Sequence, residues 1–167
     1  MREKKMTWRY EIIEQAGDKV VAKLILAAIG KLFKRDRALF KVNANERSIT
    51  HRLGIYLQEN FPNWDVDCEY NRNGHEAKYL IDKIVGIAPN DTHGKTVFPD
   101  IIVHKRKTQR NKLIIEVKKT NNRQPNCIDL EKLKGLAKRL NYESALFLRL
   151  KAGADGIGVA EFYWVNP

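Results

Sequence analysis

Apolar residues recur along the chain at two spacings, which predict an alternation of helices and strands. A period near 3.6 marks residues 8–34 and residues 44–59 as helical. The first of these segments is predicted to break near Gly17, with Asp18 capping its second part. Its inward stripe is predicted to consist of Val20, Leu24, Ala27 and Ala28. We therefore expect packing helices in front of the rest of the fold.

Strand-like runs follow, rich in β-branched residues or alternating between apolar and polar positions. The predicted strands are residues 64–72, 97–104, 113–118, 144–150 and 159–165, the last at an edge. A helix capped by Asn126 separates the third strand from the fourth. Residues 75–96 are harder to assign, with an Asn73-Gly74 turn before them and a short helix expected over 76–84. The order of the elements predicts an α/β fold in which a mixed central sheet is flanked by helices.

Two acidic residues and a lysine lie on the strands on either side of a basic hairpin. Glu116 and Lys118 point to one face of their strand, roughly 7 Å apart, because side chains alternate along a strand. If the hairpin turns symmetrically about Thr108, Asp100 stands opposite Glu116, since both lie eight positions from the centre. Paired residues place their side chains about 5 Å apart on one face. This register is an inference that a slip of one residue would overturn.

The convergence of two carboxylates and an ammonium has two interpretations. Two close carboxylates repel unless a cation lies between them, and oxygen ligands suit Mg²⁺ or Mn²⁺. Such an ion can polarise a phosphoryl oxygen, and Lys118 can stabilise the charge that develops there. The alternative is a charged cluster on a solvated sheet face. The strongly apolar residues around Asp100 and Glu116 weaken this alternative, because charges in a covered strand are costly unless paired or metal-bound.

The balance of charge points to a polyanionic partner. The chain has 31 Lys and Arg against 20 Asp and Glu, a net charge of +11. Nucleic acid is the first candidate and an anionic membrane surface the second. Cys68 and Cys127 form no CxxC pair, which speaks against a zinc ribbon or a disulfide framework and fits a reducing, cytoplasmic location. The longest apolar run, residues 20–33, contains Lys23 and Lys31 and is too short to span a bilayer.

Pro99-Asp100, followed after fifteen residues by Glu116-Val117-Lys118, resembles the PD-(D/E)xK motif of restriction-endonuclease-like nucleases. In that superfamily the motif lies on consecutive antiparallel strands of an αβββαβ core, which is the order predicted here for residues 44–150. Parts of this stretch also resemble uncharacterised bacterial members of the superfamily. The length favours a single domain, residues 1–167, made of an N-terminal helical extension (1–43), this core and a C-terminal strand (151–167).

By this resemblance the chain is a metal-dependent nuclease that hydrolyses phosphodiester bonds, with DNA as the first expected substrate. The implied ligands of Mg²⁺ or Mn²⁺ share an oxygen donor and are Asp100, Glu116, Glu46 and the backbone carbonyl of Val117. Lys118 would be the catalytic lysine. Glu46 has an alternative role in a capping box with Asn43, where its carboxylate returns to a backbone N–H. Water would attack in line and leave 5′-phosphate and 3′-hydroxyl ends.

Basic side chains near this site are the candidates for nucleic-acid contacts. Five lie at the hairpin tip, one at the strand end and two on the later helix: Lys105, Arg106, Lys107, Arg110, Lys112, Lys119, Lys134 and Lys138. The tip is expected to lie next to the metal site and to clamp phosphates there. For each group the alternative is an ordinary surface charge. Residues 31–41 hold another basic stretch, which can contact nucleic acid or a partner.

Two other functions stay open. The first is a non-catalytic nucleic-acid-binding module on the same fold, which is disfavoured because such a surface gains nothing from carboxylates that face phosphates. The second is an interaction subunit whose basic face meets an acidic protein. A homodimer is plausible for the nuclease, because cutting both strands of a duplex usually requires two active sites.

Overall fold

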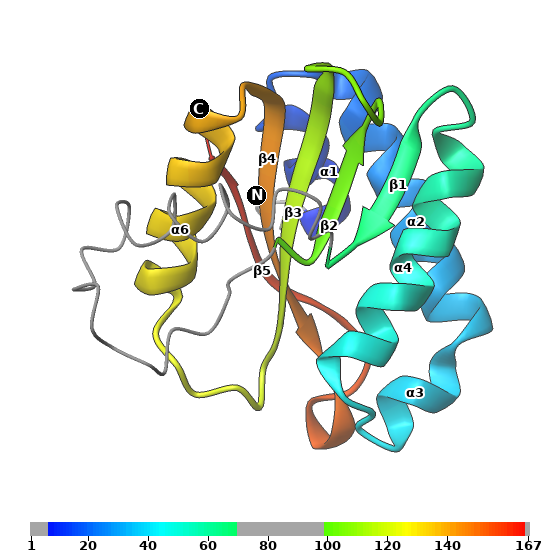
Figure 1. The fold of residues 1–167 in the computed structure, drawn as a ribbon. Helices are drawn as coiled ribbons and strands as arrows, with labels where there is room; N and C mark the ends of the chain where they lie inside the picture. The colour runs from blue at the N-terminus through cyan, green and yellow to red at the C-terminus, as the bar shows by residue number, and fades with distance from the viewer. Residues whose placement is uncertain (1–6, 70–98, 166–167) are drawn as a thin grey trace, which may run out of the picture.

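The computed structural model describes residues 7–69 and 99–165 as a five-stranded sheet with helices on both faces (Figure 1). The helices are α1 (Trp8–Glu14), α2 (Lys19–Arg35), α3 (Arg37–Lys41), α4 (Glu46–Asn60), α6 (Asn126–Arg139) and the short 3-10 helix η1 (Gly153–Asp155). The strands are β1 (Asp65–Cys68), β2 (Ile101–His104), β3 (Asn111–Lys119), β4 (Tyr142–Lys151) and β5 (Gly158–Val165). The order across the sheet is β1-β2-β3-β4-β5, so β5 forms the edge predicted for it.

The sheet is mixed, as predicted. β1, β2 and β3 form an antiparallel meander, β4 runs parallel to β3, and β5 turns back antiparallel to β4. The parallel pair is joined through α6, because parallel strands need a crossover connection. Among the described residues the elements follow the predicted order of helix, three strands, helix and strand, with helical segments in front and one strand behind.

The N-terminal helices break where the sequence predicted. The Asp18 carboxylate accepts hydrogen bonds from the backbone N–H groups of Val20 and Val21 at 2.9 and 3.0 Å, and so caps α2. The predicted inward stripe is wrong in part, because Val20 is 68% exposed and Ala27 is also exposed. A longer and more apolar row turns inward instead: Val21, Ile25, Ala28, Ile29 and Leu32.

Two hydrophobic cores lie on opposite faces of the sheet. The larger one packs the sheet against α2 and α4, and β3 contributes Leu113, Ile115 and Val117 to it. The smaller one packs the sheet against α6, and β3 contributes Ile114. β3 is therefore the central strand, covered on both faces as predicted. Glu116 follows Ile114 on the α6 face, where the smaller core ends.

Some sequence predictions fall only partly on the described residues. The predicted strand at 64–72 is seen over Asp65–Cys68, and that at 97–104 over Ile101–His104. The predicted Asn73-Gly74 turn and the helix at 76–84 lie outside the described residues. Among the helices of residues 7–69 and 99–165, none is long and apolar enough to cross a membrane.

Candidate active site

Asp100 and Glu116 meet where the ladder between β2 and β3 ends. Ile101 pairs with Ile115 and Ile102 with Ile114, and continuing this register places Asp100 opposite Glu116. The pairing predicted from the sequence therefore holds at the site. Nearer the tip a bulge shifts the register, so the hairpin is not symmetrical there. This register shift lies between the site and the turn, so it does not change the pairing of Asp100 with Glu116.

β3 continues past the point where β2 begins, and there two carboxylates accept hydrogen bonds from its backbone N–H groups. The backbone N–H of Val117 donates to Asp100 Oδ2 at 2.7 Å, and that of Lys119 donates to Glu46 Oε2 at 2.8 Å. In a sheet, the N–H and C=O of one residue face the same neighbouring strand. The Val117 carbonyl therefore opens toward Asp100. Asp100, Glu46 and the Val117 carbonyl thus lie along one edge at the end of β3, and in each of these two bonds the carboxylate uses one of its two oxygens.

Glu46 reaches β3 because α4 begins later than the capping-box alternative required. Asn45 is the N-cap residue, and its side chain accepts from the Ser48 N–H at 2.8 Å. Glu46 is therefore the first residue of the helix, not the third, and the capping box with Asn43 is wrong. Because the Glu46 carboxylate does not cap the helix, it can bind the backbone of β3.

Two buried ion pairs join the site to α6. Lys118 is 3% exposed, and its Nζ lies 2.5 Å from Asp129 Oδ2. Lys132 is 8% exposed, and its Nζ lies 2.9 Å from Glu116 Oε1. α6 therefore supplies the Lys132 ammonium that pairs with Glu116 and the Asp129 carboxylate that pairs with Lys118. Because each buried charge is paired, the site can hold Glu116 and Lys118 in a covered strand.

The sequence analysis missed both α6 residues. Asp129 and Lys132 are three positions apart, so they share one side of the helix. Lys132 also precedes the buried Leu136 by four positions, which places it on the inward side. The spacing of Lys132 from Leu136 could have identified Lys132 as an inward-facing residue. It shows that the inward side of α6 includes charged residues as well as apolar ones.

The environment holds the two converging carboxylates away from full ionisation. Burial raises the pKa of Asp100 to about 6, against the opposing effect of the Val117 N–H. Burial and the neighbouring Asp100 carboxylate raise the pKa of Glu116 to about 8, although Lys132 acts in the opposite direction. Positive charge in addition to Lys132 would favour ionisation of both carboxylates. A cation bound between them would supply it.

The donor set fits a hard divalent ion such as Mg²⁺ or Mn²⁺, because it consists of carboxylate and carbonyl oxygens. The fit has a limit. Among residues 7–69 and 99–165, no group of three His, Cys, Asp or Glu side chains stands ready to hold a metal ion. Asp100 and Glu116 are the convergent pair, while Glu46 is bound to the next stretch of β3. Complete ligation would need this third carboxylate, the Val117 carbonyl or water.

The hairpin tip lies at the other end of β3 from the acidic site (Figure 1). Glu116 is five residues from Asn111, the first residue of β3, a distance of about 17 Å along a strand. The prediction that the tip lies beside the metal site is therefore wrong. The strand between them is extended, so residues close in sequence are far apart in space.

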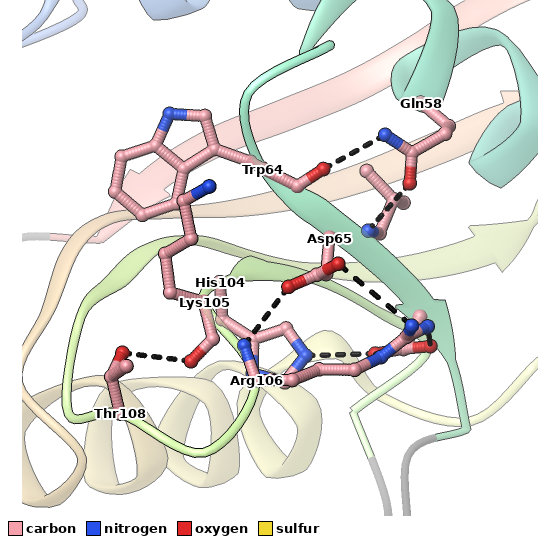
Figure 2. A network of polar contacts seen from close by, with 9 residues as sticks. Gln58, Trp64, Asp65, His104, Lys105, Arg106 and Thr108 are labelled. Carbon is pink, nitrogen blue, oxygen red and sulfur yellow. Dashed lines mark hydrogen bonds and ion pairs between the residues drawn. The ribbon is translucent and has the colours of Figure 1, made fainter.

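Several cations of the tip are engaged within the molecule (Figure 2). The Arg106 guanidinium binds Asp67, and its backbone N–H donates to Asp65 at 3.0 Å. Arg110 and Lys105 approach the Trp64 ring, at 5.1 and 5.9 Å from its centroid. These contacts fasten the tip to β1 and to the end of α4, and they reduce the charge available to a ligand.

The remaining predicted nucleic-acid contacts divide into bound and exposed groups. Lys112 Nζ lies 2.6 Å from Glu143 and 3.3 Å from Asp18. Lys119 is 5% exposed, and its ammonium donates to Asn43 and Ala44, so the prediction of a surface charge is wrong there. It points to the opposite side of β3 from Lys118, into the junction before α4. The exposed members of the set are Lys107, Lys134 and Lys138.

Comparison of the chain with family models, with curated proteins and with solved structures finds no significant match. The chemistry of the site is therefore inferred from its own groups. The half-buried Asp100 and the buried Glu116 converge at the end of one strand pair, the Glu46 carboxylate binds the backbone of the same strand, and the buried Lys118 and Lys132 ammonium groups pair with Asp129 and Glu116. Such a set can bind a divalent cation and stabilise developing negative charge.

Proposed function

We propose that the chain is a metal-dependent nuclease of the PD-(D/E)xK type that acts on nucleic acid, with DNA as the first substrate to test. The observation that carries the proposal is the meeting of Asp100 and Glu116 where β2 ends, with Lys118 two residues further on the same face. The described elements α4, β1, β2, β3, α6 and β4 support it, because they follow one another in the order expected of an αβββαβ core. The net charge of +11 suits a polyanionic substrate.

Each group has a defined task in this proposal. Asp100, Glu116, Glu46 and the Val117 carbonyl would hold Mg²⁺ or Mn²⁺, which when bound polarises a phosphoryl oxygen and lowers the pKa of a water molecule. The Lys118 ammonium stabilises the charge that grows on the phosphoryl oxygens as water attacks in line. Asp129 holds that ammonium in a fixed place before substrate arrives. Burial of these groups strengthens their electrostatic effect, because little water screens them.

A second candidate is a nucleic-acid-binding module without hydrolytic activity. One observation favours it: Glu116 and Lys118 are already neutralised by Lys132 and Asp129, so the four charges form a self-sufficient structural network. In that case metal ions would not change the protein, and nucleic acid would bind through surface cations alone. The two candidates therefore differ in their response to divalent ions.

The decisive experiment combines cleavage with metal binding. Supercoiled plasmid, single-stranded DNA and RNA are incubated with Mg²⁺, with Mn²⁺ or with chelator. Wild type is compared with Lys118→Met and Glu116→Gln, and the matched controls are Lys23→Met and Glu131→Gln at exposed positions. We expect metal-dependent cleavage that both site variants reduce by about 10²–10³-fold while both controls retain it. Calorimetry with Mn²⁺ should show weaker binding to Glu116→Gln.

Two results would contradict the nuclease proposal in different ways. Cleavage that survives both site substitutions would place the reaction elsewhere in the molecule. Binding of nucleic acid without cleavage, together with no heat of Mn²⁺ binding, would favour the non-hydrolytic module.

A further inference from the structure

A basic pocket lies between α1, α3 and the loop that contains η1. Its volume is about 420 Å³, which is within the range of small-ligand sites. The residues that line it come from α1, the end of α2, α3 and the β4–β5 loop: Arg9, Phe33, Arg37, Phe40, Lys41, Gly153, Gly156 and Ile157. We call it the α3 pocket. It is separate from the acidic site and from the hairpin tip.

Three cations face this pocket without a compensating acid in its lining. They are Arg9 on α1 and Arg37 and Lys41 on α3, and all three are exposed. Within the part of the chain that the structure describes, no ion pair engages them, although Arg9 lies over the Trp8 ring at 4.9 Å. The nearby Asp155 carboxylate accepts a hydrogen bond from the Thr120 hydroxyl. Three like charges around one hollow repel each other, and an anion between them would relieve that repulsion.

Two aromatic rings and two glycines make up most of the rest of the pocket's lining. Phe40 is fully buried and meets Phe33 edge to face, with ring centroids 5.3 Å apart. Gly153 packs against Asn43, whereas a Cβ placed on Gly156 would meet nothing within 4 Å, so the backbone is open at Gly156. A ligand can therefore approach the main chain closely.

The α3 pocket lies beside the end of β3 that carries the acidic site. Asn43 connects them: its side-chain oxygen accepts from Lys119 Nζ at 2.9 Å, and a Cβ placed on Gly153 would lie 3.5 Å from the Asn43 Cβ. Lys41 is five residues before Glu46, so their Cα atoms are at most about 18 Å apart. In Figure 1, α3 and the end of β3 lie at the bottom, opposite the hairpin tip.

We propose that the α3 pocket binds the phosphodiester backbone of the nucleic acid whose scissile bond enters the acidic site. At about 3.4 Å per nucleotide, a span of 18 Å covers about five nucleotides at most. The pocket would therefore hold a phosphate a few nucleotides from the point of cleavage. The identity of the polymer rests on the proposed function, but the binding itself needs neither a metal ion nor hydrolysis.

The test measures binding in chelator, where no metal-dependent cleavage occurs. Fluorescence anisotropy with labelled single-stranded and duplex DNA compares wild type with Arg37→Gln/Lys41→Gln. The matched control is Lys105→Gln/Lys107→Gln, which removes the same charge at the hairpin tip. We expect the pocket variant to weaken binding by at least about ten-fold and to lower the slope of log affinity on log salt by about 1.4–1.8. The tip variant should change affinity by less than about three-fold.

Several results would overturn the proposal. Equal losses in the two variants would show that only net charge matters, and no loss in the pocket variant would exclude the pocket. Inorganic phosphate and a 5′-mononucleotide serve as competitors: displacement of DNA by either at low concentration would assign the pocket to a small phosphorylated ligand. Circular dichroism confirms that both double variants are folded.

The outcome is separable from that of the nuclease proposal. Pocket-dependent DNA binding without any cleavage would contradict the nuclease proposal alone. Cleavage that depends on Lys118 but not on the α3 pocket would contradict the present proposal alone.

Discussion

The two faces of β3 differ in what they contribute. The face toward α2 and α4 is apolar from Leu113 to Val117, with Leu113, Ile115 and Val117 all buried, and Lys119 ends it. The face toward α6 begins with Ile114 and then changes to Glu116 and Lys118. One strand thus contributes a hydrophobic core on one side and a charged site on the other. The difference teaches that reactive groups can be buried in the centre of a small fold when the opposite face supplies the stability.

The fold can bury the charges on this face of β3 because residues of α6 form an ion pair with each of them. Glu116 faces Lys132 and Lys118 faces Asp129, so the burial of each charge is compensated by a partner. No such matching is needed on the apolar face, where any side chain of similar volume preserves the packing. Substitutions on the two faces should therefore affect different properties, and the following predictions separate them.

The largest effect is expected from Asp100→Asn. The amide oxygen of asparagine can still accept from the Val117 N–H, so folding should be preserved, while loss of the negative charge removes a metal ligand. Under the proposed function we expect cleavage to fall by about 10³-fold with little change in the urea midpoint. Asp65→Asn on β1 is the matched control. A variant that unfolds instead would show that Asp100 is chiefly a structural residue.

The next largest effect is expected from Lys132→Met in the metal-free protein. Removing one partner of a buried pair leaves the Glu116 carboxylate without its cation, which should lower the free energy of unfolding by about 3–5 kcal/mol at pH 8. The loss should be smaller at pH 5, where Glu116 is protonated. Urea unfolding at both pH values measures it. The double variant Glu116→Gln/Lys132→Met should recover most of the loss, and a failure to recover would show that Lys132 stabilises through packing alone.

The pH dependence of stability gives an intermediate effect. The pKa of Glu116 is raised in the folded protein from its ordinary 4.5 to about 8, and that of Asp100 from 3.8 to about 6. Between about pH 4.5 and 8 the folded state therefore binds more protons than the unfolded chain, and stability should fall as pH rises. Urea midpoints measured across this range should show the decline without metal. Excess Mg²⁺ should reduce it, and a decline unaffected by Mg²⁺ would argue against a metal site.

The smallest effect is expected from a substitution in the apolar face of β3. Ile115→Val removes one methylene group from the larger core, which should lower the free energy of unfolding by about 0.5–1.5 kcal/mol. Because Ile115 points away from the carboxylates, affinity for Mn²⁺ should be unchanged. Thermal unfolding and calorimetry measure the two quantities. A clear loss of Mn²⁺ affinity would show that the two faces of β3 are coupled.

The sequence predicted the parts of the site that depend on local periodicity. Alternation along a strand placed Glu116 with Lys118, and counting from the turn placed Asp100 opposite Glu116. The contributions of Asp129 and Lys132 could not be obtained in this way, because they depend on how α6 packs across the end of the sheet. Charged residues on a helix are ordinarily assigned to solvent, and only tertiary packing shows which of them turn inward.

Other errors came from positions decided by a single competing contact. The choice of Asn45 over Asn43 as the cap of α4 decided where Glu46 points. Val20 was misplaced for another reason: the longer apolar row from Val21 to Leu32 packs inward and leaves Val20 exposed. In both cases the sequence allowed two solutions, and a helix end selected between them for Glu46 while core packing did so for Val20.

The extension of β3 past β2 also bears on solubility. A strand edge with unsatisfied N–H groups invites pairing with another chain, which is a route to aggregation. Asp100 and Glu46 close this edge by accepting from Val117 and Lys119, and their negative charge repels an incoming carbonyl-lined strand. Inactive protein made with alanine at these positions would expose the edge. Asparagine and glutamine keep an acceptor there, so they are the better substitutions for preparing an inert but monodisperse sample.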